Sequence, residues 1–171
     1  MLKSQPVENL VFSDTGLVHL VAACVALISG ALVLFLPKAT RLHIRIGYVY
    51  FAAMLVMLVT SFSLYHLFGS FGMFHWLAVV SSVTLLAGMI PVWFRRSIPN
   101  WAAWHFSFMY WSVVGLYCAF AAETFVRLPQ SPFFAMVGIG SGLVGGIGAY
   151  FFRKNKDVWE AQYAARHVAN P

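Results

Sequence analysis

Histidine is the residue type in this sequence with the widest chemical use, because a neutral imidazole binds metal ions and haem iron. The 171-residue chain contains six histidines. Five of them lie in or beside long apolar segments: His19, His43, His66, His75 and His105. The sixth, His167, lies in a polar tail and is most simply a solvated residue. Ionisable side chains are costly within a membrane, so the other five histidines are candidate functional residues.

Two pairs of histidines are predicted at two depths of a helical bundle. His43 and His105 begin the second and fourth apolar segments, on the inner side. His19 and His75 lie near the outer ends of the first and third segments. Alternate helices of an up-and-down bundle lie diagonally opposite each other, so each pair could ligate one haem from both sides. The sequence therefore predicts a b-type haem-binding transmembrane electron carrier with these four histidines as cofactor ligands.

The outer residues allow a second interpretation, a single metal site at the outer face. Imidazole and carboxylate suit zinc, iron or copper, and four residues would supply them: His19, His66, His75 and Glu123. The sequence contains no HxxxH or HExxH pair, and Glu123 could equally serve as a proton relay. A third interpretation is a non-enzymatic membrane assembly or scaffold protein, in which the histidines near segment ends are interfacial residues. Whether the chain is an enzyme, and which residues would be catalytic, is left open.

The segment from Trp101 to Arg127 predicts one helix with a polar line along its length. Seven residues recur on that line at steps of four and three: His105, Met109, Ser112, Leu116, Ala119, Glu123 and Arg127. Because ionisable groups are costly in lipid, this face is expected to point toward protein or water. On the second segment, Gly47 lies one turn after His43 and leaves room for a bulky group. Basic residues at the same depth could neutralise haem propionates: Arg41, Arg45, Arg95 and Arg96.

The composition requires a membrane to cover these segments. The chain is 61% hydrophobic with 9% charged residues, and its mean hydropathy is +0.78, which exceeds what a soluble domain of this size can bury. Five segments approach the length of about 20 residues needed to cross about 30 Å of hydrocarbon: 16–36, 44–65, 74–94, 102–125 and 133–152. The predicted fold class is all-α, a polytopic transmembrane helical bundle of five spans. It comprises an external tail at 1–14, a membrane domain at 15–152 and a cytoplasmic tail at 153–171.

The distribution of basic residues predicts which side each loop faces. Most Lys and Arg residues lie in the segments 37–43, 95–101 and 153–171, which the positive-inside rule places in the cytoplasm. The N-terminus is then external, the C-terminus is cytoplasmic, and the chain is expected in a cell inner membrane. The net charge of +6 forms no continuous basic face, so nucleic acid is not an expected partner. The first span is predicted to be retained, because no small-residue cleavage site follows it.

Glycines in the fifth span predict close helix packing. Gly138, Gly142 and Gly146 recur at a spacing of four, which lets two helix backbones approach each other. The contact could be with a neighbouring span of the same chain, or with a homodimer mate or partner membrane subunit. The tail that follows, from Asn155 to Pro171, is expected to form a short amphipathic helix on the membrane surface.

Two motifs carry a resemblance to a known family: LHIRIGYVY (Leu42 to Tyr50) and WHFSFMYWSVVGLYCAF (Trp104 to Phe120). The first resembles the His-x-x-x-Gly opening, and the second the other signature, of bacterial membrane proteins grouped as domain of unknown function 2306 (DUF2306). The resemblance covers spans two to four and carries no established activity with it. It implies that four residues are characteristic of the family: His43, His105, Met109 and Ser112. The two-depth plan of histidines is also similar in layout to cytochrome b561-type transmembrane electron carriers.

Overall fold

The computed structural model describes residues 13–64, 71–128 and 132–169, and within these ranges it contains helices and no strand. The helices are α2 (Asp14–Phe35), α3 (Arg41–Ser61), α4 (Met73–Trp93), α5 (Trp101–Phe125) and α6 (Phe133–Ala169). All five are long and apolar enough to cross a membrane. The predicted all-α class with five spans is therefore confirmed, and the chain has the architecture of a multi-pass membrane protein.

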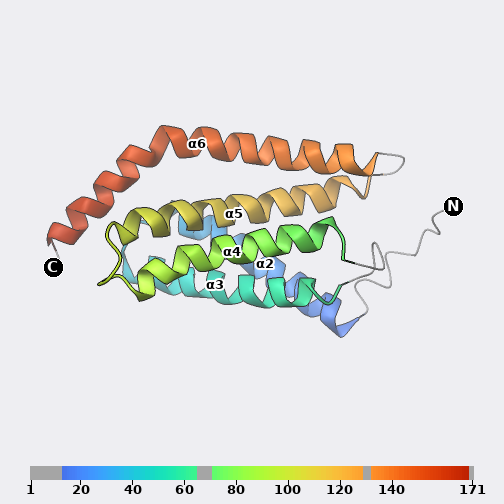
Figure 1. Cartoon of the computed structure of the whole chain (residues 1–171), viewed down its shortest axis with the longest axis horizontal. Helices are drawn as coiled ribbons and strands as arrows, with labels where there is room; N and C mark the ends of the chain where they lie inside the picture. The colour runs from blue at the N-terminus through green and yellow to red at the C-terminus, as the bar shows by residue number, and fades with distance from the viewer. Residues whose placement is uncertain (1–12, 65–70, 129–131, 170–171) are drawn as a thin grey trace.

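The two ends of the bundle need names, because the membrane side that each faces stays a prediction. The inner end is the one formed by residues 36–40 and 94–100, and the outer end is the opposite one. The helix α2 begins at the outer end and α6 ends at the inner end (Figure 1). An odd number of spans requires this separation of the termini.

Four of the helices form a ring, and the fifth packs outside it. The helix α2 lies along α3, α4 lies along α5, and contacts between α3 and α4 and between α2 and α5 close the ring. The hydroxyl of Tyr117 on α5 donates to the carbonyl of Leu27 on α2 at 2.9 Å, which ties the closing pair together. This order places α2 diagonally opposite α4 and α3 diagonally opposite α5, as the up-and-down bundle predicts.

The inner turn between α2 and α3 is held by side-chain caps. Thr40 begins α3, and its hydroxyl accepts a hydrogen bond from the backbone N–H of His43 at 3.2 Å. Lys38 bends back over the end of α2, where its Nζ donates to the carbonyls of Val33 and Leu34 at 2.8 and 2.7 Å. A cation at a helix C-terminus satisfies carbonyls that have no intrahelical partner and complements the helix dipole. The caps therefore fix His43 and Lys38 beside each other.

The middle of the ring is closed by a buried polar pair. Tyr50 on α3 is fully buried, and its hydroxyl lies 2.8 Å from the hydroxyl of Ser112 on α5. Gly30 on α2 leaves the space for the ring, because a Cβ atom there would lie 3.0 Å from Tyr50 Cε2. Apolar side chains continue the packing toward the outer end. The bundle is thus solid at mid-depth, and open space lies on the inner side of Tyr50.

The fifth span and the C-terminal tail form one continuous helix rather than a span followed by a separate short helix. The helix α6 runs without a break from Phe133 to Ala169. No proline or glycine occurs between Phe152 and Ala169 to interrupt it. Trp159 holds the extension against the bundle, with its ring centroid 4.9 Å from that of Phe106 on α5.

The glycines that bring α6 onto α5 are not the predicted ones. A Cβ atom at Gly148 would lie 2.7 Å from Cγ1 of Val114, and one at Gly140 would lie 3.0 Å from the carbonyl carbon of Ala121. The predicted stripe, made by Gly138, Gly142 and Gly146, is exposed, and a Cβ atom on any of the three would meet no atom within 4 Å. The prediction that this stripe packs on a neighbouring span of the chain is therefore wrong. Contact with a second copy or a partner subunit through the stripe stays a prediction.

Candidate cofactor site at the inner end

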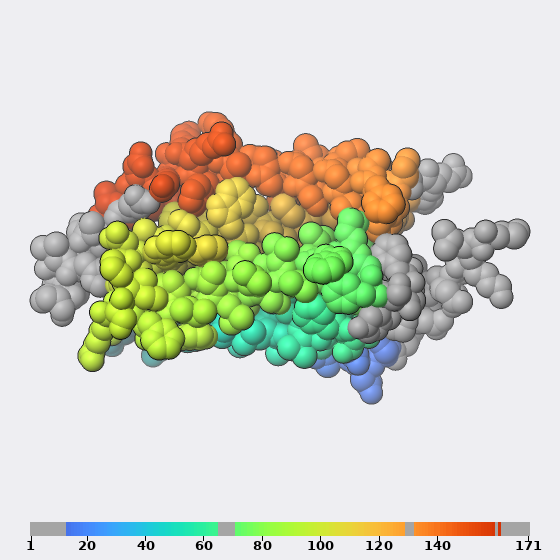
Figure 2. Space-filling view, in the orientation of Figure 1, coloured from blue at the N-terminus to red at the C-terminus, as the bar shows by residue number. Residues whose placement is uncertain are grey.

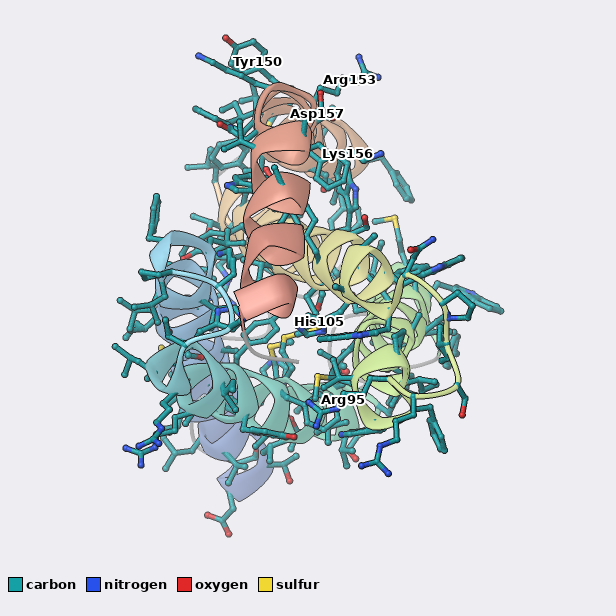
Figure 3. All side chains as sticks on the ribbon, turned by 90° about the vertical axis from the view of Figure 1, so that its left-hand side faces the viewer. Arg95, His105, Tyr150, Arg153, Lys156 and Asp157 are labelled. Carbon is teal, nitrogen blue, oxygen red and sulfur yellow. The ribbon has the colours of Figure 1, made fainter. Side chains whose placement is uncertain are left out.

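A cavity of about 550 Å³ opens at the inner end of the ring between α2, α3, α4 and α5. Its polar and sulfur-bearing wall comes from six side chains: Lys38, His43, Met89, Arg95, His105 and Met109. The rest of the wall is apolar or aromatic, including Tyr50, Trp101, Phe106 and Tyr110. Viewed from the inner end, His105 lies between the helices, with Arg95 at the same mouth (Figure 3). A mostly apolar cavity of this volume with a few convergent polar groups is typical of a ligand site.

His105 is held in one orientation by the neighbouring helix. Its Nδ1 lies 2.8 Å from the backbone carbonyl oxygen of Gly88 on α4. A carbonyl oxygen can only accept, so Nδ1 carries the proton and the Nε2 lone pair of the neutral ring is available. Metal-binding histidines commonly donate their second nitrogen to a carbonyl in this way, because the bond fixes the tautomer and the ring direction. His105 thus has the form of a ligand that binds through Nε2.

The local sequence of α4 makes this contact possible. Gly88 has no side chain to cover its carbonyl, and a Cβ atom there would lie 2.7 Å from Sδ of Met109. Pro91, three residues later inside the same helix, removes one intrahelical donor. The helices α4 and α5 therefore approach closely at the point where His105 reaches across.

His43 faces the same cavity from the diagonal helix. It is the third residue of α3, and its side chain is 9% exposed. Its Nδ1 is buried and has no hydrogen-bond partner, while Lys38, His105 and the backbone of Val33 are its electrostatic neighbours. A buried polar atom without a partner costs about 1–3 kcal/mol, and such atoms often mark a functional site. The imidazoles predicted to form the inner pair are therefore brought to one cavity.

Two basic side chains line the cavity, Arg95 and Lys38, and of these the sequence predicted a role for Arg95 alone. Arg95 was expected to neutralise an acidic group, and it lines the mouth as an exposed side chain. The other side chains predicted to neutralise haem propionates are exposed as well: Arg41, Arg45 and Arg96. Lys38 is 8% exposed, and burial lowers its pKa from 10.5 to about 8. The sequence signal for Lys38 was its place four residues after Leu34 and directly after Pro37, where a basic side chain can fold back on the helix end.

The outer histidines have structural partners of their own. His19 donates from Nδ1 to the carbonyl of Met57 at 3.1 Å, and the same nitrogen lies 3.0 Å from the hydroxyl of Thr60. His75 is buried, and its Nδ1 accepts a hydrogen bond from the backbone N–H of Gly72 at 3.1 Å, which caps α4. These bonds join α2 to α3 and fix the start of α4. An outer haem between His19 and His75 stays a prediction.

The predicted outer metal site stays a prediction as well. His66 lies outside the described residues, and Glu123 is a half-buried residue near the outer end of α5. Within the described ranges, no three His, Cys, Asp or Glu side chains are grouped closely enough to hold a metal ion. The role of Glu123 as a proton relay is likewise not tested.

Comparisons of this chain with models of protein families, with curated proteins and with solved structures found no match. The resemblance to DUF2306 therefore stays a prediction. Of the residues that it implies are characteristic, His43, His105 and Met109 line the inner cavity, and Ser112 bonds to the tyrosine that closes it.

Proposed function

We propose that this multi-pass protein resides in a cell inner membrane and binds one b-type haem in the inner cavity, as a carrier of single electrons. One observation carries the proposal: two imidazoles from diagonal helices, those of His43 and His105, face one ligand-sized cavity. Bound haem would supply one-electron chemistry, which no amino-acid side chain in this cavity supplies readily. The chain would supply the imidazoles of His43 and His105, apolar walls and neutralising charge.

The wall of the cavity matches what a haem requires. The macrocycle is flat and apolar, and Tyr50, Phe106 and Met109 offer rings and a thioether to pack against it. Its two carboxylates need cations near water, and the exposed Arg95 lines the mouth of the cavity, with the buried Lys38 in the wall behind it. The Nδ1–H of His105 donates to the carbonyl of Gly88, so the Nε2 lone pair of that ring is available to bind iron.

The proposal is limited to the inner pair because of the proton on His75. Its Nδ1 accepts from the N–H of Gly72, so in the neutral ring the proton resides on Nε2. Ligation through Nε2 would require the opposite tautomer and the loss of this cap. His105, and also His19, instead donate from Nδ1 to a carbonyl. The outer pair therefore includes one ring whose tautomer opposes ligation through Nε2, whereas His105 of the inner pair has the tautomer that allows it.

The test is an absorption spectrum of the full chain purified from cells with ample haem, recorded oxidised and reduced. We expect a Soret band and α-band of a low-spin bis-histidine haem. His105→Ala and His43→Ala should each remove or alter the same component, and the double variant should do little further harm, because ligands of one site are not additive. His167→Ala is the control and should keep the spectrum.

Two results would overturn the proposal. One is wild-type protein without a Soret band when haem is not limiting, which would favour a scaffold role. The other is a pair of variants that change unrelated properties, because that would separate His43 from His105. Insertion and yield should be equal in all variants, since alanine is easier to bury than imidazole.

A further inference from the structure

The face of α6 that points away from α5 is largely uncovered in the apolar part of the helix, within Phe133–Trp159. Only 11% of the apolar window of α6 is buried, against 28% to 44% for the other four helices. Its exposed apolar side chains include Ile139, Leu143 and Ile147, and glycines lie next to them in the sequence. In the space-filling view α6 forms one edge of the molecule, outside the four-helix ring (Figure 2). In a membrane this face meets lipid or another protein.

At the inner end, the uncovered face ends in a shallow basic pocket. The pocket is lined by Gly146, Ala149, Tyr150, Arg153 and Lys154. Nζ of Lys154 lies 5.9 Å from the centre of the Tyr150 ring. The side chains of Tyr150 and Arg153 point away from the bundle (Figure 3).

The charge of this region is positive on balance. The segment 153–157 contains three basic residues, Arg153, Lys154 and Lys156, and one acidic residue, Asp157. The tyrosine beside them is typical of the membrane interface, where an aromatic ring with a polar tip is favoured. The pocket therefore combines basic groups at headgroup depth with an apolar helix face that leads into the hydrocarbon.

We propose that this pocket binds an anionic phospholipid of the inner leaflet, independently of the haem proposal. The phosphate contacts Arg153 and Lys154, and one acyl chain lies over Gly142 and Gly146. A Cβ atom on either glycine would meet no atom within 4 Å, so the helix surface is open there beside Leu143 and Ile147. In this proposal that open surface is the channel for the acyl chain. Basic pockets at this depth recognise anionic headgroups through charge.

The length of the channel suits an acyl chain of one leaflet. At 1.5 Å per residue, the twelve steps from Gly138 to Tyr150 span about 18 Å. Half of the hydrocarbon thickness of a bilayer is about 15 Å. A chain that starts at the level of Tyr150 therefore reaches the bilayer centre about ten residues away, near Gly140.

Charge complementarity favours a lipid over a second copy of the chain. In a two-fold dimer of parallel protomers, each residue of α6 meets its own equivalent at the same depth. Such a dimer would bring two sets of Arg153 and Lys154 together, and like charges in an interface are unfavourable. An anionic headgroup removes this repulsion and pairs with the same residues.

The experiment compares phosphatidylglycerol with phosphatidylcholine as probes. The full chain in detergent is titrated with each lipid, and retained lipid is counted by native mass spectrometry. We expect wild type to prefer phosphatidylglycerol. Arg153→Gln with Lys154→Gln should weaken its binding about 30-fold, because each basic residue near an anionic surface contributes about fivefold. Arg41→Gln with Arg45→Gln is the matched control, because it removes the same charge from exposed residues at the same end of the bundle.

A second variant tests the channel without risk to the fold. Gly146→Leu fills the channel and meets no atom of the chain within 4 Å at its Cβ, so the unfolding midpoint should be kept or raised and the lipid lost. Equal losses in both charge variants would overturn the proposal in favour of a general electrostatic attraction. It is also overturned if light scattering shows that wild type is a dimer and Gly146→Leu a monomer, because a second copy would then cover the face.

Discussion

Replacement of Gly88 by alanine tests whether the close crossing of α4 and α5 positions His105. The added methyl group would lie 2.7 Å from Sδ, 2.9 Å from Cγ and 3.3 Å from the backbone nitrogen of Met109. Non-bonded carbon contacts are favourable at about 3.5–4.0 Å. The thioether can change rotamer, but the backbone nitrogen moves only if the two helices separate. Separation lengthens the 2.8 Å bond from His105 Nδ1 to the Gly88 carbonyl.

The size of the effect follows from two opposing terms. Overpacking of a tight contact costs about 1–3 kcal/mol, and alanine in place of glycine inside a helix returns about 1 kcal/mol. The net cost is about 1 kcal/mol, which corresponds to a fall of about 2–4 °C in the unfolding midpoint of a chain of this size. Under the proposed function the haem content should fall as well, because His105 loses the partner that fixes its ring.

Gly47→Ala is the matched control, because Gly47 lines the same cavity but has no atom within 4 Å of an added Cβ. It gains the helix preference without a clash, so its unfolding midpoint should rise by a few degrees, up to about 4 °C. Both variants are measured by scanning fluorimetry in detergent, with haem quantified from the absorption spectrum. The reasoning is refuted if Gly88→Ala is as stable as wild type, or if Gly47→Ala is the less stable of the two.

Three further predictions concern other parts of the chain. Tyr50→Phe should lower the free energy of unfolding by about 1–2 kcal/mol, because the buried Ser112 hydroxyl loses its partner. In a double-mutant cycle with Ser112→Ala, the double variant should lose less stability than the sum of the two single variants. The pKa of Lys38 is about 8 in the folded chain and ordinarily 10.5, so between these values the unfolded chain binds more protons. The free energy of unfolding should therefore rise as pH increases above 8, and Lys38→Met should remove this rise when midpoints are compared on both sides of pH 8. Reporter fusions after Lys156 and within 66–73 should report opposite membrane sides, and identical reports would contradict the five-span topology.

The spans and the depths of the histidines could be predicted because both depend on local information. Long apolar runs separated by short polar loops define the helices, whatever their neighbours are. The periodic line on α5 also predicted its buried face. Met109, Ser112 and Leu116 are buried in the structure, because a helix in a ring turns one face toward its partners. Farther along the same line the prediction weakens, since Arg127 lies beyond the helix end and is exposed.

The packing of α6 could not be predicted from glycine spacing alone. Glycines occur on every side of this helix, so a spacing of four is satisfied by residues on more than one face. What selects Gly140 and Gly148 is the partner surface, where the backbone at Ala121 and the branched side chain of Val114 leave no room for a Cβ atom. The shape of α5 at those two points depends on the angle at which the helices cross, which no local pattern encodes.

The histidines show the same limit in their chemistry. In the sequence the four candidate ligands are equivalent: His19, His43, His75 and His105. The structure distinguishes them by the group that lies next to Nδ1. A carbonyl meets Nδ1 of His105 and of His19, a backbone N–H meets Nδ1 of His75, and Nδ1 of His43 is buried without a hydrogen-bond partner. In a neutral ring, a carbonyl at Nδ1 leaves Nε2 with an available lone pair, whereas an N–H at Nδ1 leaves the proton on Nε2, which is then a donor. Since the carbonyl that selects the tautomer of His105 belongs to another helix, its ability to ligate depends on how α4 and α5 are aligned. A mutation that shifts this alignment, such as Gly88→Ala, can therefore change the chemistry of the site without changing a single candidate ligand.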